Sequence, residues 1–341
     1  METPPFLAAC RRQPARYTPV WLMRQAGRYL PEYRAIREKT GFLELCRTPD
    51  LAAEVTVGTA VRLGVDAAII FADILLILEP MGAGLEFTHG DGPALRHPVR
   101  SAADVDRLRE VEPGALAYVA EAVKRARAAL PPAIPLIGFA GAPFTLASYL
   151  IEGGGSRLYA RTKAFMLADP GAWRALMERL GRAVAAYLDA QIDAGADAVQ
   201  LFDSWVGCLA PPDYRTHVLP HVRELIGTIR PGTPVIHFGT DTAGLLESMR
   251  AAGGDVIGLD WRVDLDAAWS RLGHDVAVQG NLDPVALLAS VAEIRRRAAA
   301  ILGQAAGRPG HIFNLGHGVL PQTPVEHVLD LVDAVHELSA R

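Results

Sequence analysis

The stretch that decides the fold is DAAIIFADILLIL, residues 66–78. Its first part, DAAIIF at 66–71, is apolar and lacks the polar alternation of a half-exposed strand, which is typical of a parallel strand covered on both faces. Asp73 stands between this run and a second apolar run, ILLIL at 74–78. The stretch therefore predicts a buried parallel strand that is followed by a carboxylate.

Further apolar runs repeat this pattern along the chain, and longer amphipathic stretches separate them, including those at 171–194, 212–229 and 324–338. No linker or break in composition divides these strand–helix units, so we expect one α/β domain over residues 1–341, a single (β/α)8 TIM barrel. A doubly wound sheet is the alternative. The other expected strands are 134–139, 198–202, 234–238, 256–259, 276–279 and 311–315, with 19–23 as an eighth.

Residues 1–60 are rich in arginine and helical in pattern, and we expect them to form an N-terminal extension packed on the barrel. In a barrel of this class the site lies at the carboxyl ends of the strands. Polar residues that follow the expected strands are therefore candidates, although many such residues only cap helices or brace turns. We hold that plainer interpretation for Asp241, Asp260 and Asp283.

The overall charge argues against broad classes of anionic partner. The chain has 34 Lys and Arg against 38 Asp and Glu, a formal net charge of −4, whereas nucleic acids and anionic membranes are bound by an excess of basic residues. No apolar run approaches the roughly 20 residues of a membrane span. Three scattered cysteines favour a reducing compartment, so we expect a cytoplasmic protein without nucleic-acid or membrane partners.

Four arginines, Arg24, Arg28, Arg34 and Arg37, fall within RQAGRYLPEYRAIR at residues 24–37. The planar guanidinium fork binds carboxylates and phosphates, so the cluster indicates a polyanionic small molecule. The alternative is a set of surface ion pairs with nearby glutamates. Asp73 is the second candidate, because a carboxylate between apolar runs is costly unless a partner or a function retains it. A structural ion pair with an arginine is the competing explanation.

Several common machineries have no signature here: the chain contains no GxxxxGK[ST], GxGxxG or HExxH motif. His217 and His221 are four residues apart, but Pro220 interrupts the helix between them and no acidic ligand stands nearby. We therefore expect no metal site at this pair.

Six ordered blocks resemble the uroporphyrinogen decarboxylase family over about residues 17–330. PVWLMRQAGRY at 19–29 resembles its first signature and GFAGAPFTLASYLIEGGGS at 138–156 its second. The remaining blocks are IIFADIL at 69–75, QLFDSW at 200–205, GNLDP at 280–284 and NLGHGVLPQTP at 314–324. Ala72, where the family commonly has Ser, is a minor departure.

The resemblance implies a homodimeric (β/α)8 barrel that removes CO2 from the four acetate side chains of uroporphyrinogen III, giving coproporphyrinogen III without metal or organic cofactor. It places the catalytic positions at Asp73, Arg24 and Arg28. Substrate-binding positions fall on Arg37, Tyr149, Ser204 and His317, and Phe139 and Phe202 would line the pocket. The proton donor stays open between an arginine, His317, Tyr149 and an ordered water.

Two other functions remain as alternatives. A zinc-dependent methyltransferase of the methylcobamide type shares the fold but needs thiolate and imidazole ligands near the last strands, and Cys208 is the only cysteine beyond residue 46. A tetrapyrrole carrier would bind without catalysis, and a lone carboxylate matched to the pyrrole N–H groups argues against it.

Overall fold

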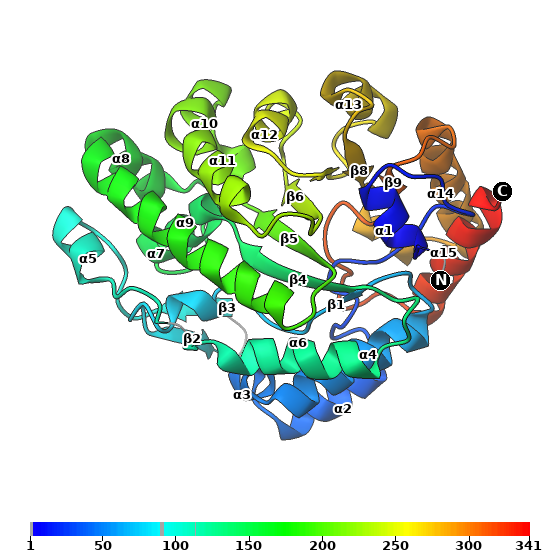
Figure 1. Ribbon diagram of the computed structural model, residues 1–341, viewed down its shortest axis with the longest axis horizontal. Coiled ribbons are helices and arrows are strands. Elements are labelled where there is room, and N and C mark those ends of the chain that lie inside the picture. The colour runs from blue at the N-terminus through cyan, green and yellow to red at the C-terminus, as the bar shows by residue number, and fades with distance from the viewer. Residues whose placement is uncertain (1–2, 89–91, 113) are drawn as a thin grey trace.

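The computed structural model describes residues 3–88, 92–112 and 114–341 and has at its centre a curled parallel sheet of seven strands, surrounded by helices (Figure 1). The strands lie side by side in chain order, without the reversal of a doubly wound sheet, so that alternative is wrong. The strands are β1 (Ala68–Ile69), β4 (Leu136–Gly141), β5 (Ala198–Asp203), β6 (Val235–Gly239), β7 (Val256–Gly258), β8 (Ala277–Gln279) and β9 (His311–Ile312).

The segment 19–23, expected as an eighth strand, makes only an isolated parallel bridge between Val20 and Phe313. Its backbone nevertheless bonds on both sides. Phe313 N–H donates to the carbonyl of Pro19 at 2.8 Å, and Asp66 N–H donates to the carbonyl of Val20 at 2.8 Å. The segment therefore lies between β9 and β1, the two edge strands of the sheet.

The first sixty residues contribute to more than one layer of the fold. Segment 19–23 lies between the two edge strands, and α4 (Pro49–Leu63) packs against α6 (Ala117–Ala129) and α15 (Val325–Ser339) in the surrounding helical layer. Within the described part of residues 1–60, the other helices are α1 (Pro5–Cys10), α2 (Pro31–Lys39) and α3 (Phe42–Arg47). Helical periodicity and arginine content alone cannot show which short segment enters a sheet, and the expected N-terminal extension stays a prediction.

The outer helices largely follow the expected pattern. The stretch expected at 212–229 is broken into two helices near Pro220, since proline cannot donate the backbone bond that would continue the first helix. The remaining helices are α5 (Ala102–Arg107), α6 (Ala117–Ala129), α7 (Pro143–Glu152), α8 (Ala160–Ala168), α9 (Pro170–Asp193), α10 (Pro211–His217), α11 (Leu219–Thr228), α12 (Leu246–Ala252), α13 (Leu265–Leu272), α14 (Val291–Ala305) and α15 (Val325–Ser339).

The two ends of the chain lie close to each other (Figure 1). Near them, hydrogen bonds to Asp66 join the last helix, α15, to the segment that precedes β1. The Asp66 carboxylate accepts hydrogen bonds from the Val20 N–H at 2.8 Å and the Tyr17 hydroxyl at 2.8 Å, and it lies 2.7 Å from His336 Nε2 on α15. Because this carboxylate is buried, its three partners tie α15 to the seam between segment 19–23 and β1.

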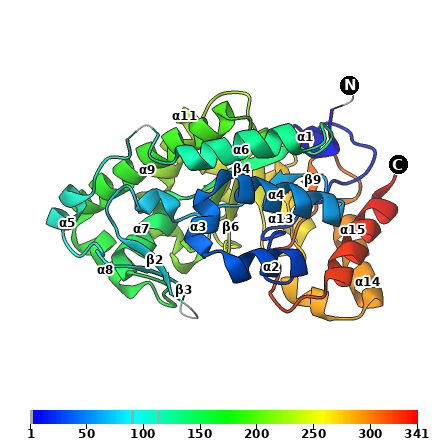
Figure 2. The ribbon, with the colours of Figure 1, turned by 90° about the horizontal axis from the view of Figure 1, so that it is seen from below.

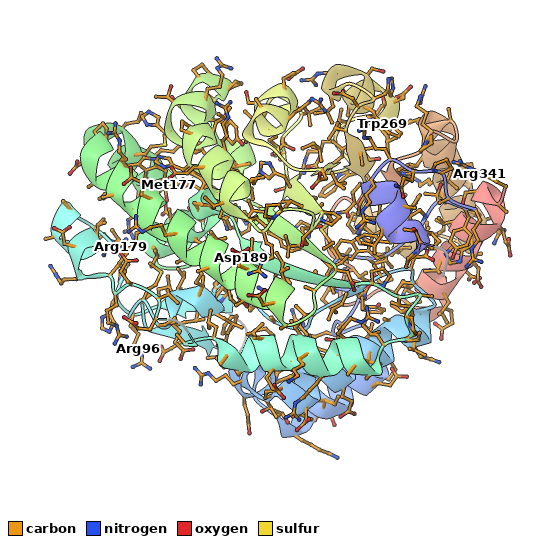
Figure 3. The ribbon with its side chains drawn as sticks, in the orientation of Figure 1. Arg96, Met177, Arg179, Asp189, Trp269 and Arg341 are labelled. Carbon is orange, nitrogen blue, oxygen red and sulfur yellow. The ribbon has the colours of Figure 1, made fainter. Side chains whose placement is uncertain are left out.

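Helix α9 shows how the outer layer holds the sheet. Its Gln191 is buried and exchanges two hydrogen bonds with the Phe139 backbone, at 2.9 and 3.0 Å, which fixes β4. Met177 of the same helix is fully buried, whereas Arg179 lies on the outer side and donates to the Val105 carbonyl at 2.7 Å (Figure 3). The helix thus packs an apolar face on the sheet and keeps its charges outside.

The two ends of the sheet carry different additions. Figure 2 shows α1 on one side of the molecule and α2, with the two-stranded antiparallel hairpin β2 (Leu85–Thr88) and β3 (Gly92–Leu95), on the other. Among the described residues, no helix combines the length and apolar character that crossing a bilayer requires.

Candidate active site

A cavity of about 1070 Å³ opens at the carboxyl ends of the strands, where a barrel of this class is expected to carry its site. Its walls come from the loops after segment 19–23, β1, β5 and β9, and from α2, α3 and the β2–β3 hairpin. The volume lies at the upper end of ligand cavities, which run to about 1,000 Å³. The site can therefore hold a ligand that is larger than most small molecules bound by proteins.

One wall of the cavity is aromatic. Phe139 and Phe202 meet edge to face with centroids 5.5 Å apart, and Phe202 meets Phe238 in the same way at 5.9 Å. Phe202 on β5 pairs in register with Phe238 on β6, whereas Phe139 on β4 pairs with Gln200, two residues before Phe202 and on the same face of β5, because side chains alternate along a strand. The cavity lining includes Phe139 and Phe202, as expected.

Asp73 lines the same cavity directly after β1. Burial raises the pKa of its carboxyl to about 6, although the Leu75 N–H, which donates to Oδ1 at 2.8 Å, and the Arg24 charge both oppose the rise. Among the described residues no cation lies within ion-pairing distance of this carboxylate. The structural ion pair proposed as the competing explanation for Asp73 is therefore not formed.

Arg24 and Arg28 also line the cavity, and no carboxylate of the described residues forms an ion pair with either guanidinium. The Arg24 backbone has a φ of 58°, in the left-handed region that long side chains rarely adopt. Because these two guanidiniums at the mouth of the pocket have no ion-pair partner among the described residues, they can bind anionic groups of a ligand.

The other two arginines of the cluster are already partly engaged. Arg37 lines the cavity, donates to the Thr40 carbonyl, and lies over the Phe42 ring with its Cζ 5.6 Å from the centroid. Arg34 is not part of the lining: it donates to the carbonyls of Arg28 and Tyr29, each at 3.0 Å, and so braces the turn before α2. The cluster thus supplies three guanidiniums to the cavity instead of four.

Tyr149 and Ser204 complete the wall beside Asp73. Burial, together with the Asp73 charge, raises the pKa of Tyr149 to about 12, so its hydroxyl stays protonated at neutral pH. The Tyr149 ring packs against Trp205, with centroids 5.8 Å apart. Ser204 and Trp205 are adjacent in the loop after β5, which explains why the QLFDSW block reaches the site.

His317 also lines the cavity, from the loop after β9. Burial, reinforced by the positive charges of Arg24 and Arg262, lowers the pKa of its imidazole to about 4. His317 is therefore neutral at physiological pH, and it can donate or accept a hydrogen bond but is not a reservoir of acidic protons.

Several lining residues were missed from the sequence because their elements are insertions. Phe42 begins α3 and packs against Phe87 of the hairpin at 4.7 Å, and both lie over the cavity with Lys39. The hydrophobic periodicity of the sequence does not distinguish these three residues from their neighbours. The apolar residue after Gly41 in an otherwise charged segment was the only available signal.

The remaining polar candidates behave as structural groups. The Asp283 carboxylate accepts from the Val285 N–H at 2.9 Å, which confirms a cap, and the Asp260 carboxylate accepts from the N–H groups of Asp241 and Arg262 at 2.6 and 3.0 Å. Within the described part of the chain, no three His, Cys, Asp or Glu side chains come close enough to bind a metal ion. This includes the His217 and His221 pair.

Comparison with known proteins agrees with the family resemblance seen in the sequence. Residues 1–338 match the family model described as "Uroporphyrinogen decarboxylase (URO-D)". The chain is 58% identical over 342 residues to the uroporphyrinogen decarboxylase of Roseiflexus sp. (strain RS-1), covering 98% of each protein, and 58% identical over 335 residues to that of Sorangium cellulosum (strain So ce56), covering 98% and 96%. A solved methyltransferase from Methanosarcina mazei superposes with a TM-score of 0.78 at 20% identity over 97% of both chains, which shows a shared fold alone.

Proposed function

Since the chain belongs to the uroporphyrinogen decarboxylase family, we propose that the cavity at the carboxyl ends of its strands is where uroporphyrinogen III is bound and decarboxylated. The reaction itself, decarboxylation of uroporphyrinogen III in tetrapyrrole biosynthesis, is that of the family. The observation that carries the site assignment is Asp73: a carboxylate without an ion-pair partner among the described residues, set beside an aromatic wall and unpaired arginines.

The two halves of the ligand match the two halves of the cavity. A uroporphyrinogen carries eight carboxylates around its rim and four pyrrole N–H groups that point inward. Arg24, Arg28 and Arg37 line the mouth and supply guanidinium forks for rim carboxylates. Asp73 supplies acceptor oxygens for the N–H groups. The aromatic wall of Phe139, Phe202 and Phe238 supplies an apolar surface for the macrocycle.

Decarboxylation needs a sink for the electron pair of the breaking C–C bond, and in our proposal the pyrrole ring is that sink. A proton adds to the ring carbon next to the acetate-bearing carbon and makes the ring iminium-like. The bond to the carboxylate breaks, CO2 leaves, and the electron pair flows to the ring nitrogen, giving an exocyclic methylene. Protonation of that methylene gives the methyl group, and the first proton leaves the ring carbon. One proton is consumed and one CO2 released per acetate.

Asp73 stabilises the positive charge that develops on the pyrrole. A carboxylate in a site of low dielectric interacts with such a charge more strongly than it would in water. Its pKa of about 6 leaves the ionised form dominant at neutral pH. Among the described residues no cation forms an ion pair with this buried carboxylate, so it is available to interact with the substrate.

The pKa values narrow the choice of proton donor. His317, with a pKa of about 4, is neutral at physiological pH, and Tyr149, with a pKa of about 12, is a weak acid. Efficient general acids have a pKa near the working pH. We therefore propose that a water ordered by Arg24 or Arg28, or one of these guanidiniums itself, delivers the proton, while His317, Tyr149 and Ser204 hold the substrate.

Four further expectations complete the proposal. We infer that segment 19–23 serves as the eighth member of a closed (β/α)8 barrel, supported by its backbone bonds to Phe313 and Asp66, and that residues 1–341 form one domain. We also propose, from family membership, that the protein is a homodimer and acts in the cytoplasm.

Anaerobic incubation with uroporphyrinogen III, followed by chromatographic separation of products by carboxyl number, tests the function. We expect products with seven, six, five and four carboxylates in the purified protein without added metal or cofactor. A protein that binds uroporphyrinogen but leaves all eight carboxylates intact is a carrier instead. Activity that disappears after treatment with a chelator and returns with zinc supports the metal-dependent alternative.

A further inference from the structure

The segment that contains Arg24 and the segment 314–319 are joined by one backbone hydrogen bond and by bonds to a buried side chain. Val319 N–H donates to the Met23 carbonyl at 2.9 Å. The side-chain oxygen of Asn314 accepts from Met23 N–H at 3.1 Å and from a backbone N–H of its own segment at 2.8 Å. Asn314 is fully buried, so water does not compete for these bonds.

Within this frame the aliphatic stem of Arg24 lies flat over Gly318. A Cβ atom at position 318 would lie 2.4 Å from the Arg24 Cδ and 2.6 Å from its Cγ, distances that real Cβ atoms essentially never show. The Arg24 φ of 58° sets the direction in which this stem leaves the backbone. The two residues therefore fit together only while position 318 has no side chain.

The need for glycine at position 318 does not come from its own backbone. Gly318 is not among the described glycines with a positive φ, so its conformation is open to any residue. Gly316, two residues earlier, is different: a Cβ there would lie 2.5 Å from the backbone nitrogen of Trp261. A side chain at 316 would thus press on the backbone, whereas the three atoms nearest to a Cβ at 318 all belong to the Arg24 side chain.

We infer that Gly318 is a positioning residue for the reaction: by leaving room for the stem of Arg24, it holds the guanidinium of that residue in the cavity beside Asp73. This inference rests on the proposed role of Arg24. A methyl group at position 318 pushes the Arg24 stem aside while the backbone frame stays in place. The defect therefore appears in turnover before it appears in stability.

The first test compares Gly318→Ala with Gly155→Ala. A Cβ at position 155 meets nothing within 4 Å, and that loop glycine has no positive φ, so it is a matched control. We expect Gly318→Ala to lower kcat by about tenfold to a hundredfold, the cost of a catalytic group displaced by about an ångström. Its melting temperature should stay near that of the wild type, and the control should match the wild type in both measurements.

The second test is a double-mutant cycle with Arg24→Ala, which removes Cγ and Cδ. If Gly318 acts through Arg24, Gly318→Ala should cost little further activity in the Arg24→Ala background, since neighbouring groups that act as a unit are non-additive. Chromatography of the products measures the small residual rates. An equal loss in both backgrounds, or full activity of Gly318→Ala alone, would overturn the inference.

Two further outcomes keep the inference separate from the proposed function. If Gly318→Ala does not fold, the double variant should regain the native melting curve because the clashing atoms are gone, and a double variant that also fails to fold contradicts the inference. If Arg24→Ala alone retains the wild-type rate, the assignment of Arg24 to the reaction is wrong, whatever position 318 does.

Discussion

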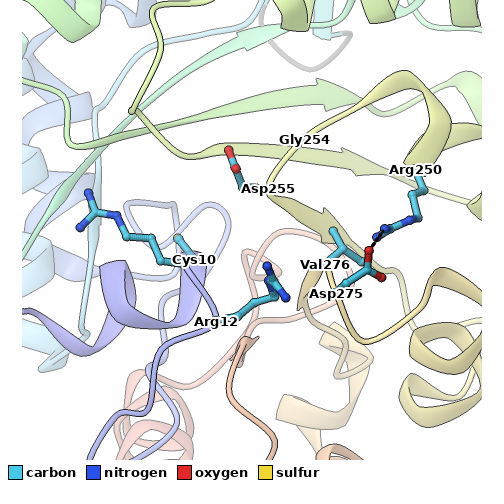
Figure 4. A pocket seen from close by; sticks show the side chains of 8 residues that line it. Cys10, Arg12, Arg250, Gly254, Asp255, Asp275 and Val276 are labelled. Atoms are coloured by element: carbon cyan, nitrogen blue, oxygen red, sulfur yellow. Dashed lines mark hydrogen bonds and ion pairs between the residues drawn. The ribbon is translucent and has the colours of Figure 1, made fainter.

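The protein has a charged cavity at each end of its sheet, and the two differ in whether an acid and a base of the lining form an ion pair. At the amino ends of β7 and β8 a cavity of about 370 Å³ is lined by two arginines that follow α1, by Arg250 of α12 and by two aspartates (Figure 4). Arg250 donates to the Asp275 carboxylate at 2.6 Å, and the Asp255 carboxylate accepts from the Val235 N–H at 2.9 Å. One acid and one base of this lining are therefore paired with each other.

At the carboxyl ends the same residue types are kept apart. Asp73 accepts from a single backbone N–H, and Arg24 and Arg28 have no ion pair with any described carboxylate. The physical consequence is visible in the pKa values: burial raises that of Asp73 to about 6, whereas a backbone N–H and the Arg250 charge lower that of Asp275 despite some desolvation. A buried carboxylate and the lack of an ion pair among the described lining residues, and not the number of charged residues, distinguish the candidate site.

The largest effect should come from neutralising Asp73. Asp73→Asn keeps the bond from the Leu75 N–H but removes the negative charge, so we expect turnover to fall by about a thousandfold or more, since electrostatic stabilisation of the transition state is lost. At neutral pH the variant should be more stable by about 3 kcal/mol, because burial raises the pKa of Asp73 from 3.8 to about 6 and each unit of raised pKa costs about 1.4 kcal/mol. Product chromatography and thermal unfolding measure the two. A near-wild-type rate removes Asp73 from the mechanism.

A change of pH should weaken the site without any mutation. The ionised form of Asp73 is the active one and its pKa is about 6, so kcat/KM should fall about tenfold per pH unit below 6. The contribution to stability has the opposite sign: the charged form is penalised by burial, so stability declines as pH rises from about 4 through 6. A rate that is flat between pH 7 and 5, measured on stable protein, contradicts this assignment.

Removing Arg37 should have a smaller effect, because its guanidinium is already partly held by the Thr40 carbonyl and the Phe42 ring. We expect Arg37→Ala to raise KM about tenfold with kcat within about twofold, the pattern of lost uniform binding. Arg37→Lys keeps the positive charge but loses the planar guanidinium, so its KM should lie between those of the wild type and of Arg37→Ala. An unchanged KM in both variants excludes a role in gripping the substrate.

The smallest effect is expected at the opposite cavity. Asp275 is exposed and its pair with Arg250 is screened by water, so Asp275→Asn should leave kcat and KM within about twofold of the wild type. The same steady-state assay measures this. A large loss of activity here would show that satisfied charges at the amino ends also matter to the reaction, and the contrast between the two cavities would fail.

Much of the fold was predictable because buried parallel strands leave a direct trace in sequence. The runs at 66–71, 134–139 and 198–202 all overlap a strand of the central sheet. Segment 19–23 forms only an isolated bridge, because the N–H groups of Val20 and Met23 bond to side chains instead of to a neighbouring strand. The arrangement of residues 1–60 was not predictable in detail, since local pattern does not distinguish a helix of the outer layer from an extension.

Two kinds of group in the site could be read from the sequence: a carboxylate after an apolar strand and a run of arginines. Residue type and spacing are sufficient for these, because they concern only a few neighbouring residues. The folded structure was needed to show which arginines line the cavity, that His317 is neutral, and that Gly318 lies against the stem of Arg24. Burial and close packing arise between segments almost three hundred residues apart, and no local pattern records them.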